Sequence, residues 1–273
     1  LATIIDIFTS AGCEVTIRTT QGRADATAAA EYACLTGKYD IMVCSGGDGT
    51  LNEVVQGMMH SQCPIPLGYI PCGSTNDFGR SLKIPSDIEE AAQLVLNGHP
   101  FACDIGTFHS RNFLYVAAFG ALCDVPYTTS RKAKETFGTL AYIATGLSKL
   151  DTIKPIRTKV TVSGKTKEMN LLFGLIFSGG RVAGNQIVSK SKSKMNDGEF
   201  NVLLVEYVEA PILETPDLLA VLTQSNKYLH RYKTNEITIE FEDDVNWTLD
   251  GEEARLSKVV NIKNIKKALT LKA

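Results

Sequence analysis

Three glycines and one aspartate fall within four consecutive residues, a combination that suits phosphate binding. They are Gly46, Gly47, Asp48 and Gly49, and Thr50 follows them. Glycine has no Cβ, so its backbone N–H groups can face a ligand at close range. A helix that begins here would add free N–H groups and the positive end of its dipole. The alternative is an ordinary tight turn in which Asp48 or Thr50 caps the helix.

The sequence on either side predicts the strand and the helix that such a loop needs. Residues 39–43 form a short apolar run, as in a buried strand, and residues 51–59 carry apolar side chains at helical spacing. The loop is not a dinucleotide-binding fingerprint, because Asn52 stands where the last glycine would be. It is not a Walker A loop either, because no Gly-Lys-Ser/Thr follows.

Two further aspartates follow or end predicted strands in the same half of the chain. Asp77 lies in a turn-rich stretch after the apolar run 66–70, and Asp104 ends the predicted strand 101–103. Residues at the carboxyl ends of parallel strands meet at one edge of a sheet. Three carboxylates there would repel one another without a cation, and Mg²⁺ favours oxygen ligands beside phosphates. Each aspartate taken alone is more often a turn or capping residue.

Helices and strands alternate through the first half, which predicts βαβ units and a mostly parallel sheet. We expect further helices at residues 1–11, 24–35 and 87–96 and further strands at residues 14–19 and 66–70. Ser86 is the expected N-cap of the last helix, and Glu89 would complete a capping box.

The pattern changes after about residue 106, where strands predominate. We expect strands at residues 112–119, 156–163, 167–177, 199–205, 236–241 and 246–249, and helices at 138–150 and 216–222. The sequence therefore predicts an α/β domain at residues 1–106 and a β-rich antiparallel domain at residues 107–273.

Composition excludes some classes of function. The formal charge of -2 gives no sign of nucleic-acid binding. The longest apolar stretch, residues 171–177, is too short to cross a bilayer, which takes about 20 residues. Seven scattered cysteines indicate reduced thiols and a cytoplasmic protein. We find no signal peptide, so we expect any membrane contact to be peripheral.

Six segments together resemble a known family. In order they are GGDGTLNEVVQG, PLGYIPCGSTNDFGRSL, CDIG, SGGRVAGN, NDGEF and LDGEE. From about residue 13 to the C-terminus the chain resembles the soluble bacterial branch of the diacylglycerol kinase catalytic-domain family. The GGDGT loop also occurs in sphingosine kinases, NAD kinases and phosphofructokinases, whereas GSTNDF is more specific. The resemblance implies an N-terminal α/β domain of the NAD kinase and phosphofructokinase type. It also implies an ATP- and Mg²⁺-dependent kinase that converts diacylglycerol to phosphatidic acid.

The resemblance also implies roles for individual residues. Those expected to bind ATP are Thr20, Gly46, Gly47, Asp48, Gly49, Thr50, Leu51, Asn52 and Ser74. Asp48, Asp77 and Asp104 would form a water-mediated magnesium network. Glu252 would be the general base that deprotonates the lipid hydroxyl. Arg80 would neutralise phosphate charge or pair with an aspartate, and a plain surface salt bridge is the alternative.

A structural Mg²⁺ site is implied at the turn around Asp197. The ligands would be the carboxylate of Asp197 and the backbone carbonyls of Lys194 and Glu199. Residues 190–194 alternate lysine and serine, whereas relatives carry proline, alanine and apolar residues there. This turn and the Asp-Gly turn before Glu252 are alternatively plain hairpin turns, and the lysines alternatively face anionic lipid.

Other possibilities remain open at this stage. The acceptor is alternatively phosphatidylglycerol, a sphingoid base or a polyprenol, and the enzyme is alternatively an NAD kinase or a non-catalytic sensor. Relatives begin with a strand and an Asn-Pro-x-Ser-Gly loop, which are not found in this sequence, so we expect truncation or disorder. The resemblance also implies a homodimer that works at the membrane surface.

Overall fold

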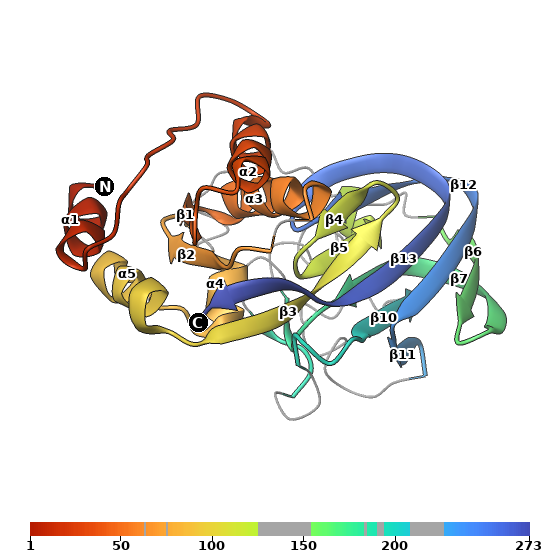
Figure 1. The fold of residues 1–273 in the computed structure, drawn as a ribbon. Helices are drawn as coiled ribbons and strands as arrows, with labels where there is room; N and C mark the ends of the chain where they lie inside the picture. The colour runs from red at the N-terminus through yellow and green to blue at the C-terminus, as the bar shows by residue number, and fades with distance from the viewer. Residues whose placement is uncertain (63, 75, 125–153, 183–184, 190–193, 208–226) are drawn as a thin grey trace. The chain divides into compact units, whose positions relative to one another are not determined.

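The chain divides into two compact units (Figure 1). The computed structural model describes residues 1–273 except 63, 75, 125–153, 183–184, 190–193 and 208–226. Unit 1 comprises Leu1–Ile105 together with Ile265–Ala273, and unit 2 comprises Gly106–Asn264. The C-terminal residues therefore belong with the first unit, whereas the sequence-based division gives them to the second domain.

Unit 1 combines helices with a short parallel sheet. Its helices are α1 (Ala2–Ser10), α2 (Asp25–Thr36), α3 (Asp48–His60), α4 (Asp77–Leu82) and α5 (Ile88–Asn97). Its strands are β1 (Met42–Gly46), β2 (Leu67–Pro71), most of β3 (Pro100–Phe108) and the end of β13 (Glu252–Lys272). β1 runs parallel to β2, and Leu271 of β13 pairs in parallel with Leu67 of β2.

Helix α3 packs against β1 and against its neighbour α2, and these contacts fix its position along the strand. Leu51, Val55 and Met58 are buried, as the helical spacing predicts. In Figure 1, α2 and α3 lie side by side, and they are in direct contact. A Cβ on Gly57 would lie 2.4 Å from the carbonyl oxygen of Thr27, so glycine allows the two helices to approach. This packing fixes where the first turn of α3 begins.

Three expectations about unit 1 are wrong. Residues 14–19 form no strand, because they lie along the surface without a partner strand, and Ile17 is 48% exposed. The N-cap of α5 is Asp87, not Ser86, because its carboxylate reaches the backbone N–H groups of Glu89 and Glu90. Asp104 lies inside β3, not at its end, because buried Ile105 continues the strand.

Unit 2 is built mostly from antiparallel strands, as expected. They include β4 (Arg111–Phe113), β5 (Val116–Gly120), β6 (Ile156–Val162), β7 (Lys165–Phe177), β10 (Phe200–Glu206), β11 (Leu229–Thr234) and β12 (Glu236–Leu249). Strand order is β13-β12-β5-β7-β10-β11, and β6 also pairs with β12 and β7. β8 (Arg181–Val182) and β9 (Asn185–Gln186) form a separate pair, and α6 (Ala121–Asp124) follows β5.

An aromatic core fixes the hairpin between β12 and β13. Trp247 of β12 is fully buried, and its ring centroid lies 4.7 Å from that of Phe119 and 5.0 Å from that of Phe108. Leu249 and Glu252 face each other across the hairpin. The turn that carries Glu252 is therefore anchored in the core.

Several strands of unit 2 differ from the expected boundaries. The expected strand at 112–119 is split into β4 and β5, and those at 236–241 and 246–249 merge into β12. The sequence pattern missed β11 and the long β13, whose pattern is interrupted by lysines and asparagines. The expected helices at 138–150 and 216–222 lie outside the described residues.

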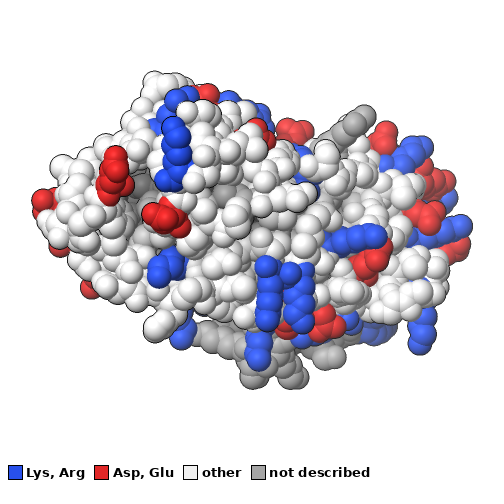
Figure 2. Space-filling model, viewed as in Figure 1, with Lys and Arg blue, Asp and Glu red and all other residues white. Residues whose placement is uncertain are grey.

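On the face shown in Figure 2, basic and acidic side chains are interspersed and neither sign covers a continuous area. Among the described residues, no helix is both long and apolar enough to cross a membrane.

Cys34 is disulfide-bonded, so the expectation of reduced thiols is wrong for this residue. The spacing of cysteines in the sequence does not show which of them lie close together in space.

Candidate phosphate-binding loop and acidic turns

The backbones of two glycine-containing loops touch in unit 1. One follows β1 at Gly47 and the other follows β2 at Gly73. A Cβ added to Gly73 would lie 2.6 Å from the Cα of Gly47, which no side chain could tolerate without a backbone shift. The pair also shares a hydrogen bond, from the N–H of Cys72 to the carbonyl of Gly46, at 2.9 Å. The parallel pairing of β1 and β2 therefore delivers both loops to one place.

The N-terminus of α3 is bare. Its N-cap is Gly47, and no side chain of the described residues caps it. Neither Asp48 nor Thr50 takes the capping role that the alternative interpretation assigned. A Cβ on Gly46 would lie 2.9 Å from the Cβ of Thr50, so glycine is needed for Thr50 to fold back over the loop. The first N–H groups of α3 are thus left without a side-chain acceptor among the described residues, as at an anion site.

Asp48 instead caps a different helix. Its Oδ2 accepts a hydrogen bond from the backbone N–H of Asp77 at 3.1 Å, and its Oδ1 accepts one from Phe78 at 3.5 Å. These N–H groups belong to the first turn of α4, whose N-cap is Asn76. The carboxylate therefore ties the glycine loop to the segment that carries Ser74. Burial raises the pKa of Asp48 above its usual value, while the N–H groups of Asp77, Phe78 and Asn76, and then Arg80, oppose the shift.

Asn76 shapes the second loop, and sequence analysis did not single it out. Its Oδ1 accepts from the N–H of Gly73 at 3.0 Å, and its Nδ2 donates to the carbonyl of Gly73 at 2.7 Å. Its own φ of 49° lies in the left-handed region that asparagine tolerates better than most residues. The signal was present in the sequence, because Asn in a Gly-Ser-Thr-Asn turn commonly bonds its own backbone neighbours.

Glu53 of α3 holds the segment that contains Thr20, and it too was missed. Its carboxylate accepts from the N–H of Ala24 at 3.0 Å and from the N–H of Ala26 at 3.2 Å. These groups lie at the start of α2, and Ala24 stands four residues after the exposed Thr20. The helix that follows the glycine loop thus also fixes the end of the Thr20 segment.

The remaining candidate residues of unit 1 differ in exposure. Ser74, Gly49 and Arg80 are exposed, whereas Leu51 and Asn52 are buried in α3. The side chain of Leu51 belongs to the core, and its backbone N–H is used within the helix. That N–H donates to the carbonyl of Gly47 at 3.0 Å.

The three aspartates do not form a direct metal-ligand set. Among the described residues, no three side chains of His, Cys, Asp or Glu group closely enough to hold a metal ion. The structure brings Asp48 and Asp77 together. Asp104 is 1% exposed, and its Oδ1 accepts from the backbone N–H of Lys267 in β13 at 2.8 Å. Carboxylate oxygens are still the type of ligand that Mg²⁺ favours, either directly or through water molecules.

In unit 2, Asp250 fixes the turn that presents Glu252. Its buried carboxylate accepts three backbone hydrogen bonds, from Leu114 at 2.7 Å and from Tyr115 and Val116 at 3.0 Å each. These bonds also explain why the chain breaks between β4 and β5. The sequence showed Asp250 only as a hairpin residue, because its partners lie far away in the sequence.

Glu252 is the first residue of β13 and is half-buried. Its carboxylate has no hydrogen-bond or ion-pair partner among the described residues. A carboxylate that is positioned but not engaged is able to accept a proton. The neighbouring Glu253 is exposed.

The turn around Asp197 already contains a cation. Nζ of Lys233 lies 2.8 Å from Oδ2 of Asp197 and 3.1 Å from Oε2 of Glu199. The hydrogen bonds to these two carboxylates raise the pKa of Lys233. Oδ1 of Asp197 accepts from the N–H of Glu199 at 3.2 Å. The residues present therefore do not fit the expected structural Mg²⁺ site, in which Lys194 and Glu199 would supply carbonyl ligands.

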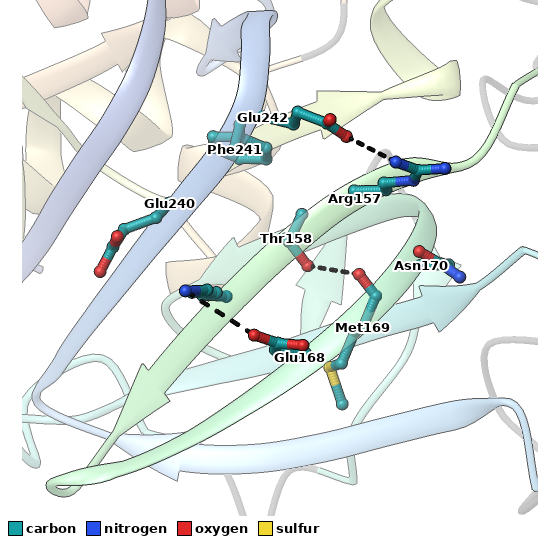
Figure 3. A pocket seen from close by; sticks show the side chains of 9 residues that line it. Arg157, Thr158, Glu168, Met169, Asn170, Glu240, Phe241 and Glu242 are labelled. Carbon is teal, nitrogen blue, oxygen red and sulfur yellow. Dashed lines mark hydrogen bonds and ion pairs between the residues drawn. The ribbon is translucent and has the colours of Figure 1, made fainter.

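A hollow of about 540 Å³ lies on unit 2 (Figure 3). It lies against β6, β7 and β12, and two ion pairs cross it, Arg157 with Glu242 and Lys159 with Glu168. No candidate site residue lines it. Its charged, open lining makes it a surface feature of the sheet.

Comparison with known proteins identifies the family. Residues 1–108 match the family described as "Diacylglycerol kinase catalytic domain". The chain is 31% identical over 255 residues to a diacylglycerol kinase of Bacillus subtilis, covering 92% of this chain and 84% of that protein. It is 33% identical over 246 residues to one of Staphylococcus epidermidis, covering 89% and 77%.

Solved structures share the fold. The crystal structure of a diacylglycerol kinase from Bacillus anthracis superposes with a TM-score of 0.76 at 24% identity, covering 92% of this chain and 83% of that one. Another Bacillus anthracis chain superposes with a TM-score of 0.84 at 23% identity, covering 99% and 88%. Together with the sequence identities, this confirms the resemblance read from the six segments: the chain belongs to the diacylglycerol kinase family.

Proposed function

We propose that this chain is an ATP- and Mg²⁺-dependent lipid kinase that phosphorylates diacylglycerol to phosphatidic acid. The observation that carries the proposal is the bare N-terminus of α3, packed backbone against backbone on the loop at Gly73. Such a surface offers N–H groups to a polyphosphate without steric obstruction. The relatives at 31% and 33% identity, which are named diacylglycerol kinases, support the choice of acceptor.

In the proposed mechanism the first unit holds ATP. The phosphates bind the backbone at residues 46–52, and the hydroxyls of Thr20 and Ser74 make further contacts. Asp48 fixes the loop at Gly47 relative to helix α4, because its carboxylate accepts hydrogen bonds from the first backbone N–H groups of that helix. Phosphoryl transfer depends mainly on alignment and charge neutralisation, so a rigid cradle is the principal contribution of this unit. Arg80, exposed in α4, would supply positive charge.

Magnesium would enter with ATP and neutralise charge on its phosphates. Asp48, Asp77 and Asp104 would hold it through water molecules. The carboxylates of Asp48 and Asp104 also accept from backbone N–H groups, which fixes their orientation. The proposed network is therefore outer-sphere at the protein.

Glu252 of the second unit is the proposed general base. It would take the proton from the lipid hydroxyl as that oxygen forms a bond to the γ-phosphorus and the bond from the γ-phosphorus to the bridging oxygen of ADP breaks. Its carboxylate is disengaged among the described residues, which supports this role. Positioned bases of this kind contribute about 10²–10⁴-fold to rate.

We further infer the setting of the reaction. Diacylglycerol resides in membranes, so the enzyme would act at the membrane surface from the cytoplasm, as a homodimer of the family type. We assign unit 1 to the NAD kinase and phosphofructokinase type of α/β fold.

The decisive experiment is transfer of ³²P from [γ-³²P]ATP to diacylglycerol in mixed micelles. We expect labelled phosphatidic acid from the wild type, none without Mg²⁺, and a loss of about 10²-fold or more in Glu252→Ala. Glu253→Ala is the matched control, because it removes an exposed carboxylate one residue away. Equal activity in Glu252→Ala and the wild type would refute the assignment of the base.

Parallel reactions separate the alternatives. Phosphatidylglycerol, a sphingoid base and a polyprenol replace diacylglycerol in the micelle, and NAD replaces it in solution. A product with one of these and none with diacylglycerol would reassign the acceptor. ATP binding without any product would instead support a sensor.

A further inference from the structure

The turn at residues 195–199, here called the acidic turn, is held by protein groups on three sides. Met195 is 6% exposed and packs on Gly179, where a Cβ would lie 3.1 Å from its Cγ. Asn201, at the start of β10, donates from Nδ2 to the carbonyl of Gly179 at 2.9 Å. The two ends of the turn are therefore fastened to the same glycine by packing and by a hydrogen bond.

The third side is Lys233 of β11. In the antiparallel pairing of β10 with β11, Lys233 lies opposite Asn201. Glu199 stands just before the first residue of β10, two residues from Asn201, so the pairing of β10 with β11 brings Lys233 close to it. The ammonium of Lys233 lies beside both carboxylates of the turn, with Nζ 2.8 Å from Oδ2 of Asp197 and 3.1 Å from Oε2 of Glu199.

A divalent cation would compete with this ammonium for the same oxygens. Mg²⁺ or Ca²⁺ binds carboxylate oxygen at about 2.0–2.6 Å, which would place it within a few ångströms of Nζ. Two positive charges so close repel each other strongly. The ammonium also neutralises one of the two carboxylate charges of the turn, which lowers its attraction for a metal.

We propose that the ammonium of Lys233 is the resident cation of the acidic turn and that this turn takes no divalent metal. The family resemblance implies a structural Mg²⁺ at this same turn. The lysine- and serine-rich residues 190–194, which depart from the family pattern, are a separate sequence feature of the same region. The proposal concerns folding and metal content, so it stands or falls independently of the kinase reaction.

The test is thermal unfolding without nucleotide, in excess EDTA and in millimolar MgCl₂ or CaCl₂. Asp197→Asn removes the carboxylate that a structural metal would need, so any metal effect that it shares with the wild type arises elsewhere. We expect equal metal-dependent shifts of Tm in the wild type and Asp197→Asn, to within about 1 °C. A wild-type shift that Asp197→Asn abolishes would overturn the proposal. This comparison needs no lysine variant to fold.

The second arm removes the ammonium. Lys233→Met keeps the aliphatic stem and exposes both carboxylates, so we expect it to gain a metal-dependent rise in Tm of about 3 °C or more. The double variant Lys233→Met with Asp197→Asn should lose that gain. Lys263→Met is the matched control, because it breaks the surface ion pair of Lys263 with Glu236, at 3.3 Å, elsewhere in unit 2. No gain in Lys233→Met, or an equal gain in Lys263→Met, would overturn the proposal.

Discussion

The carboxylate of Asp48 accepts a hydrogen bond from the backbone N–H of Asp77, with 3.1 Å between Oδ2 and N. Asp48 begins the helix after the glycine loop, and Asp77 begins the helix after the next strand. A residue that the sequence offers as a metal or phosphate ligand is thus also the link between two loops. The proposed function and the local structure would therefore depend on the same side chain.

The first prediction concerns how the partly buried carboxylate of Asp48 changes the free energy of unfolding with pH. Its folded-state pKa is raised above the usual value of 3.8, mainly by burial. A raised acid pKa contributes stability that is fully present below the unfolded pKa and is lost as pH rises through the folded pKa. Asp48→Asn removes this loss and retains an oxygen for the N–H of Asp77. We expect its free energy of unfolding, measured in EDTA by urea titration, to depend less on pH above 3.8 than that of the wild type.

The kinase activity of Asp48→Asn should fall, although its stability should not. Asp48→Asn lacks the charge proposed for the magnesium network, so phosphate transfer should fall at neutral pH although the protein is no less stable. A variant whose stability declines with rising pH as steeply as the wild type would contradict the assigned cause of the pKa shift.

The second prediction concerns the contact of Gly47 with Gly73. In Gly73→Ala the new Cβ would meet the Cα of Gly47 at 2.6 Å and Oδ1 of Asn76 at 2.8 Å, so the loops must separate. We expect a loss of about 1–3 kcal/mol in stability, as for overpacking in a core. Isothermal titration should show the Kd for ATP raised about 10-fold or more, which corresponds to about 1.4 kcal/mol.

Gly22→Ala serves as the control for this substitution. A Cβ at Gly22 would meet nothing within 4 Å. It should leave both stability and the Kd for ATP close to the wild-type values. Normal ATP binding by Gly73→Ala would show that the close loop contact is unnecessary for the nucleotide site.

The third prediction concerns Asp250, whose carboxylate is the acceptor for three buried N–H groups. Asp250→Ala leaves these groups without their acceptor. Each unsatisfied buried donor costs about 1–3 kcal/mol, so we expect a loss of about 3 kcal/mol or more in urea unfolding. Asp250→Asn should lie between this variant and the wild type, because it keeps one acceptor oxygen.

Asp87→Ala provides the comparison. Asp87 also accepts from two backbone N–H groups, but it does so as the exposed N-cap of α5. Loss of such a cap costs about 1 kcal/mol. If the two alanine variants lose equal stability, burial of the Asp250 network does not have the importance assigned to it.

The fourth prediction concerns the reactivity of the cysteines near the glycine loop. Burial raises the pKa of Cys44 to about 12 and that of Cys103 to about 12, so both remain protonated and unreactive until strongly alkaline pH. Cys72 and Cys13 are exposed free thiols. Mass spectrometry after iodoacetamide treatment at mildly alkaline pH should find Cys72 and Cys13 alkylated and the two buried cysteines unmodified.

Nucleotide should then distinguish the two exposed thiols. Cys72 precedes Gly73, so ATP bound at the proposed site should slow its alkylation, whereas Cys13 reacts at an unchanged rate. Equal protection of both cysteines, or of neither, would argue against ATP binding beside Cys72.

The sequence by itself determined the features that depend on neighbours in the chain. The apolar spacing of α3, the strand before the glycine loop and the antiparallel character of unit 2 follow from local periodicity. The six family segments are likewise linear patterns, which is why the sequence alone indicates the family. The expected strand at residues 14–19 shows the limit, because an alternating pattern forms a strand only when a partner strand is available.

Tertiary structure decided everything that depends on contact between distant residues. Asp48 reaches Asp77, Asp250 reaches the residues between β4 and β5, and Lys233 reaches Asp197, although nothing local distinguishes these side chains from ordinary turn or surface residues. Strand pairing sets such meetings, since the register of β10 with β11 alone places Lys233 opposite Asn201. A carboxylate shows its chemical type in the sequence, but only the fold shows whether it faces a backbone N–H, an ammonium or neither.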